Sequence, residues 1–415
     1  MDFLTTPARR RLLFASLYAS EGAPIGFLWW ALPTILRSRG IPVEDITVLT
    51  SILVLPWAGK FLWAPLVDVL RTRWSLKNWI LSAQLLMGLT LLPLLILDLE
   101  TQFNHLASFL VLHALAAATQ DVSIDALCIR VTSAGERGAL NGWMQTGMLT
   151  SRSLLGGGTL VLLEAFGWTP VVVLLLAVVW FSSALLVVSR VPLHTPTTVS
   201  SQQRTPFRDF LSHLRLAFSR RVTWFALLFA ASSGAAFEAV GAVAGPFLID
   251  RGFSSSQVGM FFLIPAVVST IGGALLGGML ADRMPKVQSV RIFLFSMVAC
   301  VVFLAGADGI GSGGEILLVG MTLIYFSIGL FVSSTYALFM DLTDPELGAT
   351  QFSAYMGATN FCESWSAFAI GTLAGSMGYS AGFFVMAGVS LLAASILPAF
   401  PSNVSDRLPE QPPQK

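Results

Sequence analysis

Charged side chains lie inside stretches of this sequence that are otherwise apolar and long enough to cross a membrane. Insertion scales put the cost of one charge at the centre of a bilayer at about 2.5–3.5 kcal/mol. Several such residues in one chain therefore indicate ion pairs within a helix bundle or a polar cavity between helices. Solute transport is the commonest reason to build either one. The residues are Glu21, Lys60, Asp121, Asp125, Arg152, Glu238 and Glu363.

Asp121 and Asp125 are four residues apart, so their carboxyl groups share one face of a helix. Each carboxylate disfavours the charged form of the other, and burial has the same effect. A carboxyl group that exchanges protons is what a proton-coupled carrier needs. Asp125 is equally well explained as the partner of Lys60 or Arg130 in a latch. We therefore predict a proton site at Asp121 and either role at Asp125.

The apolar stretches dominate the composition. Hydrophobic residues make up 55% of the 415 residues and charged residues 11%, against about 25% charged in soluble domains. Lipid must therefore cover much of the surface, and each helix needs about 20 apolar residues to cross it. We predict an all-α polytopic membrane protein with twelve spans, over 12–36, 46–67, 76–98, 105–130, 139–163, 168–190, 222–249, 256–281, 288–308, 315–340, 349–375 and 379–400.

Arginine and lysine are distributed unevenly over the predicted loops. Of the 24, 19 fall on the side of the N-terminus, three on the opposite side and two within spans. Because cytoplasmic loops are enriched in these residues, both termini are predicted to be cytoplasmic. The predicted domains are a six-helix bundle over 1–190, a basic cytoplasmic linker over 191–221 with a short amphipathic helix, a second bundle over 222–400, and a tail over 401–415.

The two bundles share motifs in the same order. Parallel repeats related by an axis along the membrane normal are the arrangement of major facilitator transporters, which this sequence therefore resembles. The resemblance implies two pseudo-symmetric six-helix bundles. The matching pairs are Leu32-Pro33 through Arg39-Gly40 with Gly245-Pro246 through Arg251-Gly252, Ala64–Asp68 with Gly278–Asp282, and Glu136–Gly138 with Glu346–Gly348.

The second of these motifs resembles the Gly-xxx-Asp-Arg/Lys signature of the same superfamily. The copy at Gly278–Arg283 fits it, whereas the first copy departs at Ala64 and Val69. A carboxylate at a helix end can cap a facing helix N-terminus and pair with arginines. We predict that such contacts latch one conformation, through Asp68, Arg71, Arg73, Arg130, Asp282 and Arg283.

Longer blocks of the first bundle resemble narrower families. Lys60–Asp68, Thr119–Ala126 and Glu136–Gly138 resemble AmpG-like muropeptide permeases and the related acetyl-CoA transporters. The stretch Gly22–Phe27 with Ala31-Leu32-Pro33 resembles siderophore permeases of the RhtX/FptX type. AmpG-type permeases often carry extra helices, for which this chain has no room. The resemblance thus implies import of a siderophore-like solute first, of a muropeptide second, and efflux of amphipathic compounds third.

The remaining candidates lie on helices that line the central cavity of this fold or near them. Glu21 and Glu238 join Asp121 in predicting an acidic cavity, although each Glu could instead be bonded at a helix kink. Arg152 could bind an anionic substrate group, neutralise Asp121 or form a structural ion pair. Lys60 is either a latch, a substrate contact or a snorkelling side chain. The predicted substrate-binding residues are Lys60, Arg152, Trp29, Trp30, Tyr336 and Glu363.

Other function classes lack their motifs. The sequence has no Gly-xxxx-Gly-Lys-Ser/Thr loop for ATP, so a gradient must supply the energy. It has no nucleophile elbow and no zinc ligand set, so we expect no enzyme, cofactor or metal. The expected partners are a small-molecule substrate, protons and the lipid bilayer, with no nucleic acid, for a monomer in the inner membrane. A non-transporting membrane sensor stays an alternative.

Overall fold

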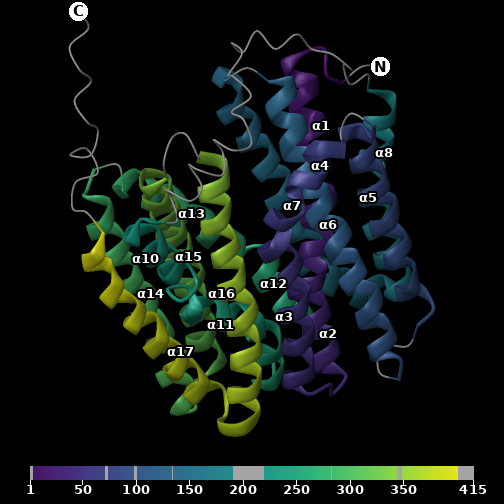
Figure 1. Cartoon of the computed structure of the whole chain (residues 1–415). Coiled ribbons are helices and arrows are strands. Elements are labelled where there is room, and N and C mark those ends of the chain that lie inside the picture. The colour runs from purple at the N-terminus through teal and green to yellow at the C-terminus, as the bar shows by residue number, and fades with distance from the viewer. Residues whose placement is uncertain are drawn as a thin grey trace, which may run out of the picture. The chain divides into compact units, whose positions relative to one another are not determined.

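The chain is a succession of long helices (Figure 1). The structure, a computed structural model, describes residues 3–70, 73–97, 101–132, 134–189, 219–281, 283–343 and 348–400. Within these ranges it contains no strand. The helices fall where the apolar stretches predicted the twelve spans, so the all-α membrane fold is confirmed.

Six helical segments form the first part of the chain. The first is continuous but changes its winding in the middle, where a single turn is a π-helix. The second is interrupted at Trp63, two residues before Pro65, which has no N–H to continue the hydrogen bonds of the preceding turn. The segments are α1 (Pro7–Gly26) with η1 (Phe27–Ala31) and α2 (Leu32–Ser38), α3 (Val43–Gly59) with η2 (Lys60–Leu62) and α4 (Ala64–Leu70), α5 (Leu76–Leu91) with η3 (Leu92–Leu95), α6 (Phe103–Val131), α7 (Ala134–Phe166) and α8 (Trp168–Val188).

Six further segments follow residue 219. The first is broken at 231–234 and the second at Ile264, directly before Pro265. The segments are α10 (Arg221–Ala230) with α11 (Ala235–Asp250), α12 (Ser255–Leu263) with α13 (Pro265–Ala281), α14 (Lys286–Gly309), α15 (Gly314–Leu342), α16 (Gly348–Met377), and α17 (Tyr379–Ala393) with η5 (Ala394–Ala399).

Hydropathy separates these segments into two groups. Among the described residues, nine helical segments are long and apolar enough to cross a bilayer. The segment α1–η1–α2, α7 and α16 fall below the same apolar threshold. Each of these three carries one of the predicted charged site residues, Glu21, Arg152 and Glu363 respectively.

Contacts divide the chain into two compact units. Unit 1 holds Met1–Ser201, Ala239–Val267 and Glu363–Tyr379, and unit 2 holds Gln202–Glu238, Val268–Cys362 and Ser380–Lys415. The boundaries fall inside α11 and α16, so the predicted bundles of 1–190 and 222–400 stay a prediction. Most of the predicted linker 191–221, its amphipathic helix and the tail 401–415 lie outside the described residues.

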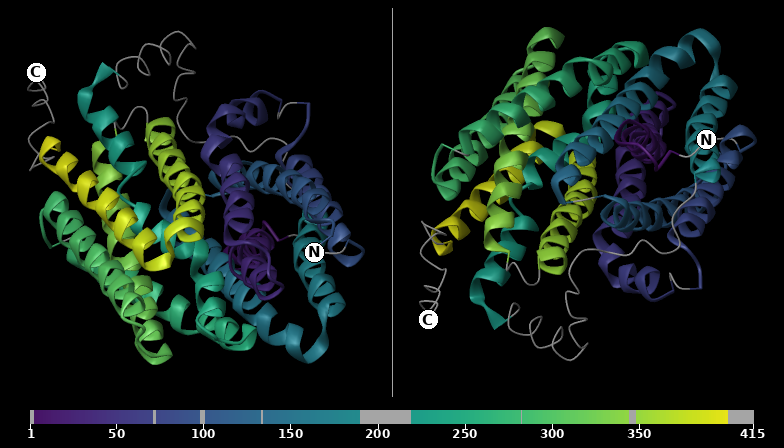
Figure 2. Two further views of the ribbon diagram at one scale, coloured as in Figure 1. Left: turned by 90° about the horizontal axis from the view of Figure 1, so that it is seen from below. Right: turned by 90° about the horizontal axis from the view of Figure 1, so that it is seen from above.

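In unit 1, α1 packs along α7, and the two can be followed together in Figures 1 and 2. Glycines make this contact close. A Cβ on Gly26 would lie 2.1 Å from the carbonyl oxygen of Arg152, and one on Gly147 would lie 2.1 Å from that of Ala15. Small residues allow such backbone approach between membrane helices. The contact places η1 directly beside the middle of α7.

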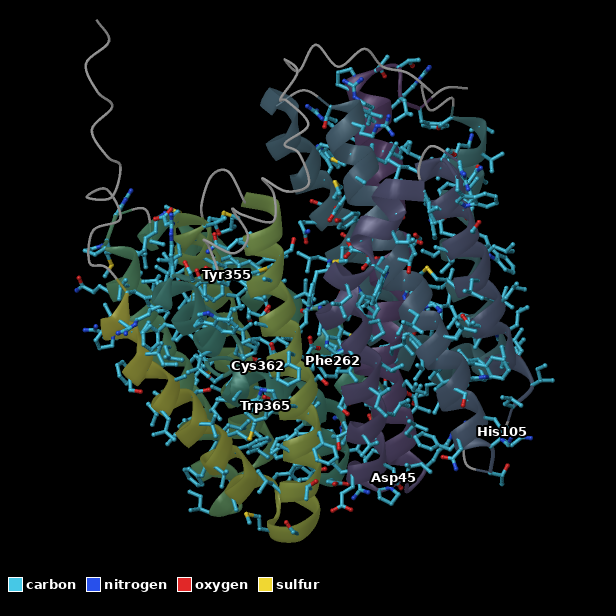
Figure 3. All side chains as sticks on the ribbon, viewed as in Figure 1. Asp45, His105, Phe262, Tyr355, Cys362 and Trp365 are labelled. Carbon is cyan, nitrogen blue, oxygen red and sulfur yellow. The ribbon has the colours of Figure 1, made fainter. Side chains whose placement is uncertain are left out.

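Unit 2 is built around the pair α14 and α15, with α10 against α15 and η5. Phe229 of α10 is fully buried and meets Phe331, Phe339 and Phe400 edge to face, with ring centroids 5.9–6.5 Å apart. On α16 the amide of Gln351 donates to the hydroxyls of Thr223 and Tyr355, at 3.1 and 2.9 Å. Tyr355 is labelled in Figure 3. This unit therefore has an aromatic core of its own.

Candidate functional site

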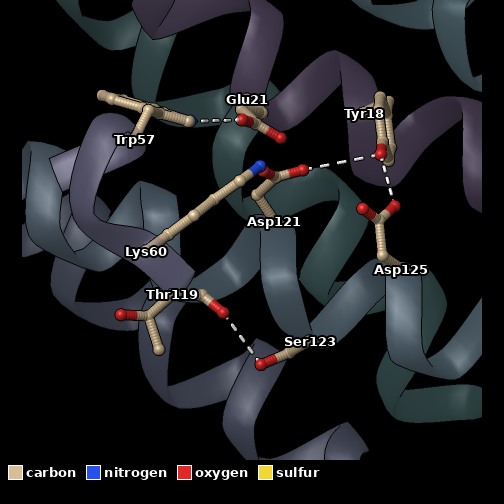
Figure 4. Close-up of polar contacts among 8 residues, drawn as sticks. All are labelled: Tyr18, Glu21, Trp57, Lys60, Thr119, Asp121, Ser123 and Asp125. Carbon is tan, nitrogen blue, oxygen red and sulfur yellow. Dashed lines mark hydrogen bonds and ion pairs between the residues drawn. The ribbon is translucent and has the colours of Figure 1, made fainter. Parts of the chain in front are cut away.

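Three helices of unit 1 bring ionisable and hydrogen-bonding side chains together in what we call the carboxylate cluster (Figure 4). α1 supplies a tyrosine and a glutamate, the α3–η2 segment a tryptophan and a lysine, and α6 two aspartates one turn apart. The two aspartates share a helix face, as their spacing predicted. The members are Tyr18, Glu21, Trp57, Lys60, Asp121 and Asp125.

Asp121 is the centre of this cluster. It is buried, and its Oδ2 forms an ion pair with Nζ of Lys60. α3 ends at Gly59, so Lys60 starts the short η2 turn instead of lying within a continuous helix as predicted. Lys60 is thus the cation beside Asp121, and of the three roles predicted for Arg152 the structure does not support neutralising Asp121. Removing either partner would leave a charge in a low-dielectric site, which is strongly unfavourable.

Tyr18 connects the two aspartates. Its hydroxyl lies 2.6 Å from Oδ1 of Asp125 and 3.5 Å from Oδ1 of Asp121. A hydroxyl has one proton to donate, so the shorter contact is the hydrogen bond and the other aspartate is within reach. Asp125 is therefore hydrogen-bonded to Tyr18, and its predicted role in a latch with Lys60 or Arg130 stays a prediction. Sequence reasoning missed Tyr18, although it lies three residues before Glu21 on the same helix face.

Glu21 is the most deeply buried of the three carboxylates, with 1% of its surface exposed. Its Oε1 accepts a hydrogen bond from Nε1 of Trp57 at 3.1 Å. Its Oε2 is buried and has no hydrogen-bond partner among the described residues. Buried polar atoms are nearly always paired, so an orphan oxygen marks a place where a proton or a donor group of a ligand would bind.

A second group, which we call the Arg152 cluster, lies further along α1. The guanidinium of Arg152 lies over the Trp30 ring at 4.7 Å. The ring of Phe262 on α12, labelled in Figure 3, stacks on the Trp30 ring, with centroids 5.0 Å apart and an angle of 7° between the planes. On α16, Oε1 of Glu363 accepts a hydrogen bond from Nε1 of Trp29 at 2.7 Å, and the carboxylate interacts electrostatically with Arg152.

The π-helix η1 places the two tryptophans of this cluster. Pro33 has no N–H, so the carbonyl of Trp29 loses its usual helical donor and the turn can widen. The N–H of Leu32 donates instead to the carbonyl of Phe27, five residues back. Single π turns within α-helices occur frequently at functional sites. Sequence reasoning missed this turn; the signal was Pro33, one turn after Trp29.

The two clusters touch through their tryptophans. The rings of Trp29 and Trp57 meet edge to face, with centroids 5.8 Å apart and planes at 85°. Each indole N–H donates to the carboxylate of its own cluster, Glu363 for Trp29 and Glu21 for Trp57. One connected group of side chains therefore runs from Asp125 to Arg152.

A third polar contact in unit 1 was not predicted. Arg37 at the end of α2 pairs with Asp250 at the end of α11, with Nε and Oδ1 2.7 Å apart. The hydroxyl of Tyr379, the first residue of α17, donates to Oδ2 of the same aspartate at 2.8 Å. Three helix ends are tied together here. Asp45 and His105, labelled in Figure 3, lie at the same end of unit 1, opposite the N-terminus.

Two of the other predicted site residues belong to the second unit. Glu238 and Tyr336 belong to unit 2 and are half-buried there. Of the predicted latch residues, Arg73, Arg130 and Arg283 are exposed. Arg71, Asp282 and the side chain of Asp68 lie outside what the structure describes, so the latches stay a prediction. Within the described part of the chain no group of three or more His, Cys, Asp or Glu could hold a metal ion.

Comparison with known proteins defines the class. Residues 14–371 match the model of the Major Facilitator Superfamily, and the chain belongs to this superfamily of membrane transporters. It is similar to the putative transporter AmpG 4 of Rickettsia conorii, with 23% identity over 90% of this chain and 92% of the relative. It is also similar to the anhydromuropeptide permease of Escherichia coli K12, with 26% identity over 83% of this chain and 70% of the relative. The resemblance to AmpG-like permeases is thus confirmed.

Solved structures agree on the fold. The D-xylose–proton symporter matches with a TM-score of 0.76 and 11% identity, over 94% of this chain and 97% of its own. A bacterial homologue of the human lysosomal transporter Spinster matches with a TM-score of 0.74 and 14% identity, over 98% and 99%. At these identities the likeness concerns the fold alone. The predicted major facilitator fold is therefore confirmed.

Proposed function

We propose that this transporter imports a muropeptide, a sugar–peptide fragment of the cell wall, together with protons. The observation that carries the proton coupling is the ion pair between Lys60 and buried Asp121, with the orphan oxygen of Glu21 nearby. The substrate is supported by the similarity to the anhydromuropeptide permease over 83% of the chain. The siderophore that the first bundle's motifs favoured stays a prediction and forms one arm of the test.

Protonation of Asp121 would change the forces on Lys60. With Asp121 charged, the ammonium group of Lys60 is held against α6. A proton on Asp121 removes that attraction and leaves Lys60 to the remaining carboxylates of the cluster, Glu21 and Asp125. Because Lys60 sits on the short η2 turn, its movement would be passed to α3 and α4. This is the kind of local charge change that biases an element with two arrangements.

Tyr18 would serve as the connection between the aspartates. Its hydroxyl is hydrogen-bonded to Asp125 and is within 3.5 Å of Asp121, so rotation about the C–O bond would redirect the proton. Asp125 is exposed, whereas Asp121 and Glu21 are buried. Asp125 lies one turn nearer the predicted cytoplasmic end of α6, so a proton would leave Asp121 past Tyr18 and be released at Asp125. The cycle would be alternating access by a monomer in the inner membrane, with both termini in the cytoplasm.

Uptake by the purified transporter in proteoliposomes tests this function. The radiolabelled probes are an anhydromuropeptide, a ferric siderophore and an amphipathic dye, each with and without an inward proton gradient. We expect accumulation of the anhydromuropeptide only with the gradient, abolished by a protonophore. Accumulation of the siderophore instead would overturn the substrate, and gradient-independent equilibration of the muropeptide would overturn the coupling.

A further inference from the structure

Arg152 is a half-buried cation that donates no hydrogen bond among the described residues. Its Nε atom is buried and has no hydrogen-bond partner among the described residues. The contacts that the guanidinium does make are with the face of the Trp30 ring and, through space, with the charge of Glu363. A guanidinium carries five N–H donors in a planar fork. An unsatisfied buried donor is costly, so its presence calls for an acceptor supplied from outside.

Glu363 compensates the charge of Arg152 without occupying its donors. No ion pair forms between the two within the described residues, and Oε1 of Glu363 instead accepts a hydrogen bond of 2.7 Å from Trp29. Trp29 is set in that position by the π turn η1. The charges of Arg152 and Glu363 therefore offset each other while the guanidinium donors stay available.

The aromatic rings hold the position of the guanidinium group. Trp30 is 7% exposed and stacks on Phe262, so its ring has little freedom to turn away from Arg152. The guanidinium lies over the Trp30 ring, and the backbone of Arg152 is in close contact with Gly26. An arginine that is oriented before its ligand arrives binds more tightly, because less freedom is lost on binding.

We propose that Arg152 binds a carboxylate of the transported solute through a pair of parallel N–H···O hydrogen bonds. The planar fork matches the two oxygens of a carboxylate, and surroundings of low dielectric strengthen the contact. This inference rests on the proposed function. In a peptide-bearing muropeptide the free carboxylates belong to the peptide, because the lactyl carboxyl of the muramic acid is used in the amide bond to that peptide. Arg152 would therefore prefer a fragment with free carboxylates over the same fragment with those groups converted to amides.

Isothermal titration of the purified transporter in detergent tests the assignment. The probes are the anhydro-disaccharide tripeptide, the same compound with its carboxylates converted to amides, and the anhydro-disaccharide with its lactyl carboxyl converted to an amide. In wild-type protein we expect amidation to weaken binding by about tenfold to a hundredfold, the range for a hydrogen bond to a charged group. Arg152→Gln should weaken binding of the acid by a similar factor and leave the affinity for the amide unchanged within a factor of about two.

Two further variants separate ligand binding from a structural role. Arg152→Lys keeps the charge, loses the fork, and should fold yet bind the acid more weakly. Glu363→Gln keeps an oxygen for Trp29 and removes the competing charge, so it should bind the acid as tightly as wild type or more so. If Arg152 served only to balance Glu363, Glu363→Gln and Arg152→Gln would weaken binding alike. Arg39→Gln, at an exposed arginine after α2, controls for loss of one positive charge.

The outcomes distinguish this inference from the function on which it rests. Equal affinity of wild-type protein for the acid and the amide would overturn the carboxylate site and leave muropeptide import standing. Absence of binding to all three probes, with uptake of the siderophore in proteoliposomes, would overturn the function and this inference with it. Weakened binding of both acid and amide by Arg152→Gln would likewise contradict a carboxylate contact.

Discussion

Trp29 and Trp57 meet edge to face with ring centroids 5.8 Å apart, and each donates its indole N–H to a different carboxylate. Trp29 belongs to the Arg152 cluster and Trp57 to the carboxylate cluster. An edge-to-face pair contributes about 0.5–1.5 kcal/mol beyond the area it buries. The pair is therefore a direct contact between the proposed substrate site and the proposed proton site.

The tryptophan pair predicts coupling between two substitutions. Trp29→Phe and Trp57→Phe each keep an aromatic ring and remove one N–H donor, so each should lower uptake and cost about 1–3 kcal/mol where a carboxylate oxygen is left unpaired. Because the rings touch, the double variant should differ from the sum of the two by about 0.5–1.5 kcal/mol in unfolding free energy. The measurement is the unfolding free energy of the wild type, the two single variants and the double variant. Additive effects within error would show that the two tryptophans are not coupled.

Asp121→Asn should abolish gradient-driven uptake while the protein stays folded. The amide keeps the size and one acceptor for Lys60 but cannot take up or release a proton. Uptake driven by a pH gradient is the measurement, and the melting profile in detergent is the control for folding. Normal accumulation by this variant would remove Asp121 as the proton site.

Tyr18→Phe removes the hydroxyl that is hydrogen-bonded to Asp125 at 2.6 Å. We expect a loss of about 1–3 kcal/mol in unfolding free energy, because a charged acceptor loses its donor. Uptake should fall as well, since the connection to Asp121 is lost. Tyr325→Phe, at a buried tyrosine of unit 2 that is not among the predicted site residues, is the matched control. Equal effects of the two variants on uptake would argue against a role for Tyr18.

Gly26→Val tests the close contact of α1 with α7. The new Cβ would lie 2.1 Å from the carbonyl oxygen of Arg152, so the helices must separate. Overpacking of this kind costs about 1–3 kcal/mol, and it would also move Arg152 away from Trp30. Gly241→Val is the control, because a Cβ there has no neighbouring atom within 4 Å among the described residues. The melting temperatures of the two variants decide the point.

The contact between Arg37 and Asp250 predicts rescue by charge exchange. Arg37→Asp places two carboxylates side by side, and Asp250→Arg places two cations there, so each single variant should be less stable and transport more slowly. The double variant Arg37→Asp with Asp250→Arg restores one charge of each sign and should recover part of both. If the double variant is no better than the worse single one, the ion pair does not hold the three helix ends.

The fold was predictable because apolar length is a strong signal in a membrane protein. The span predicted over 105–130 is α6 at Phe103–Val131, and that over 315–340 is α15 at Gly314–Leu342. The exceptions are interruptions within spans. The second segment breaks at Trp63, just before Pro65, and the eighth breaks at Ile264, just before Pro265. Hydropathy did not predict these breaks, because it averages over a turn and does not register one missing N–H.

The site was predictable in its charged members and not in their partners. Burial in an apolar stretch picks out Lys60 and Asp121 from the sequence, but their pairing depends on where α3 ends and how it packs on α6. Tyr18 was missed since a tyrosine in an apolar helix carries no charge signal. The register of Trp29 and Trp30 depends on one π turn, which no periodicity in a single helix reveals.

The low apolarity of α1, α7 and α16 has a consequence for biogenesis. A segment that carries Glu21, Arg152 or Glu363 is less favourable to release into lipid by itself than its neighbours are. Each would enter the bilayer readily only once a partner helix is present to receive its polar face. Glu363 on α16 meets Trp29 and the charge of Arg152, both made long before it. Assembly of the polar cluster would then be completed late, when the eleventh segment is inserted and contacts helices that were synthesised at the start of the chain.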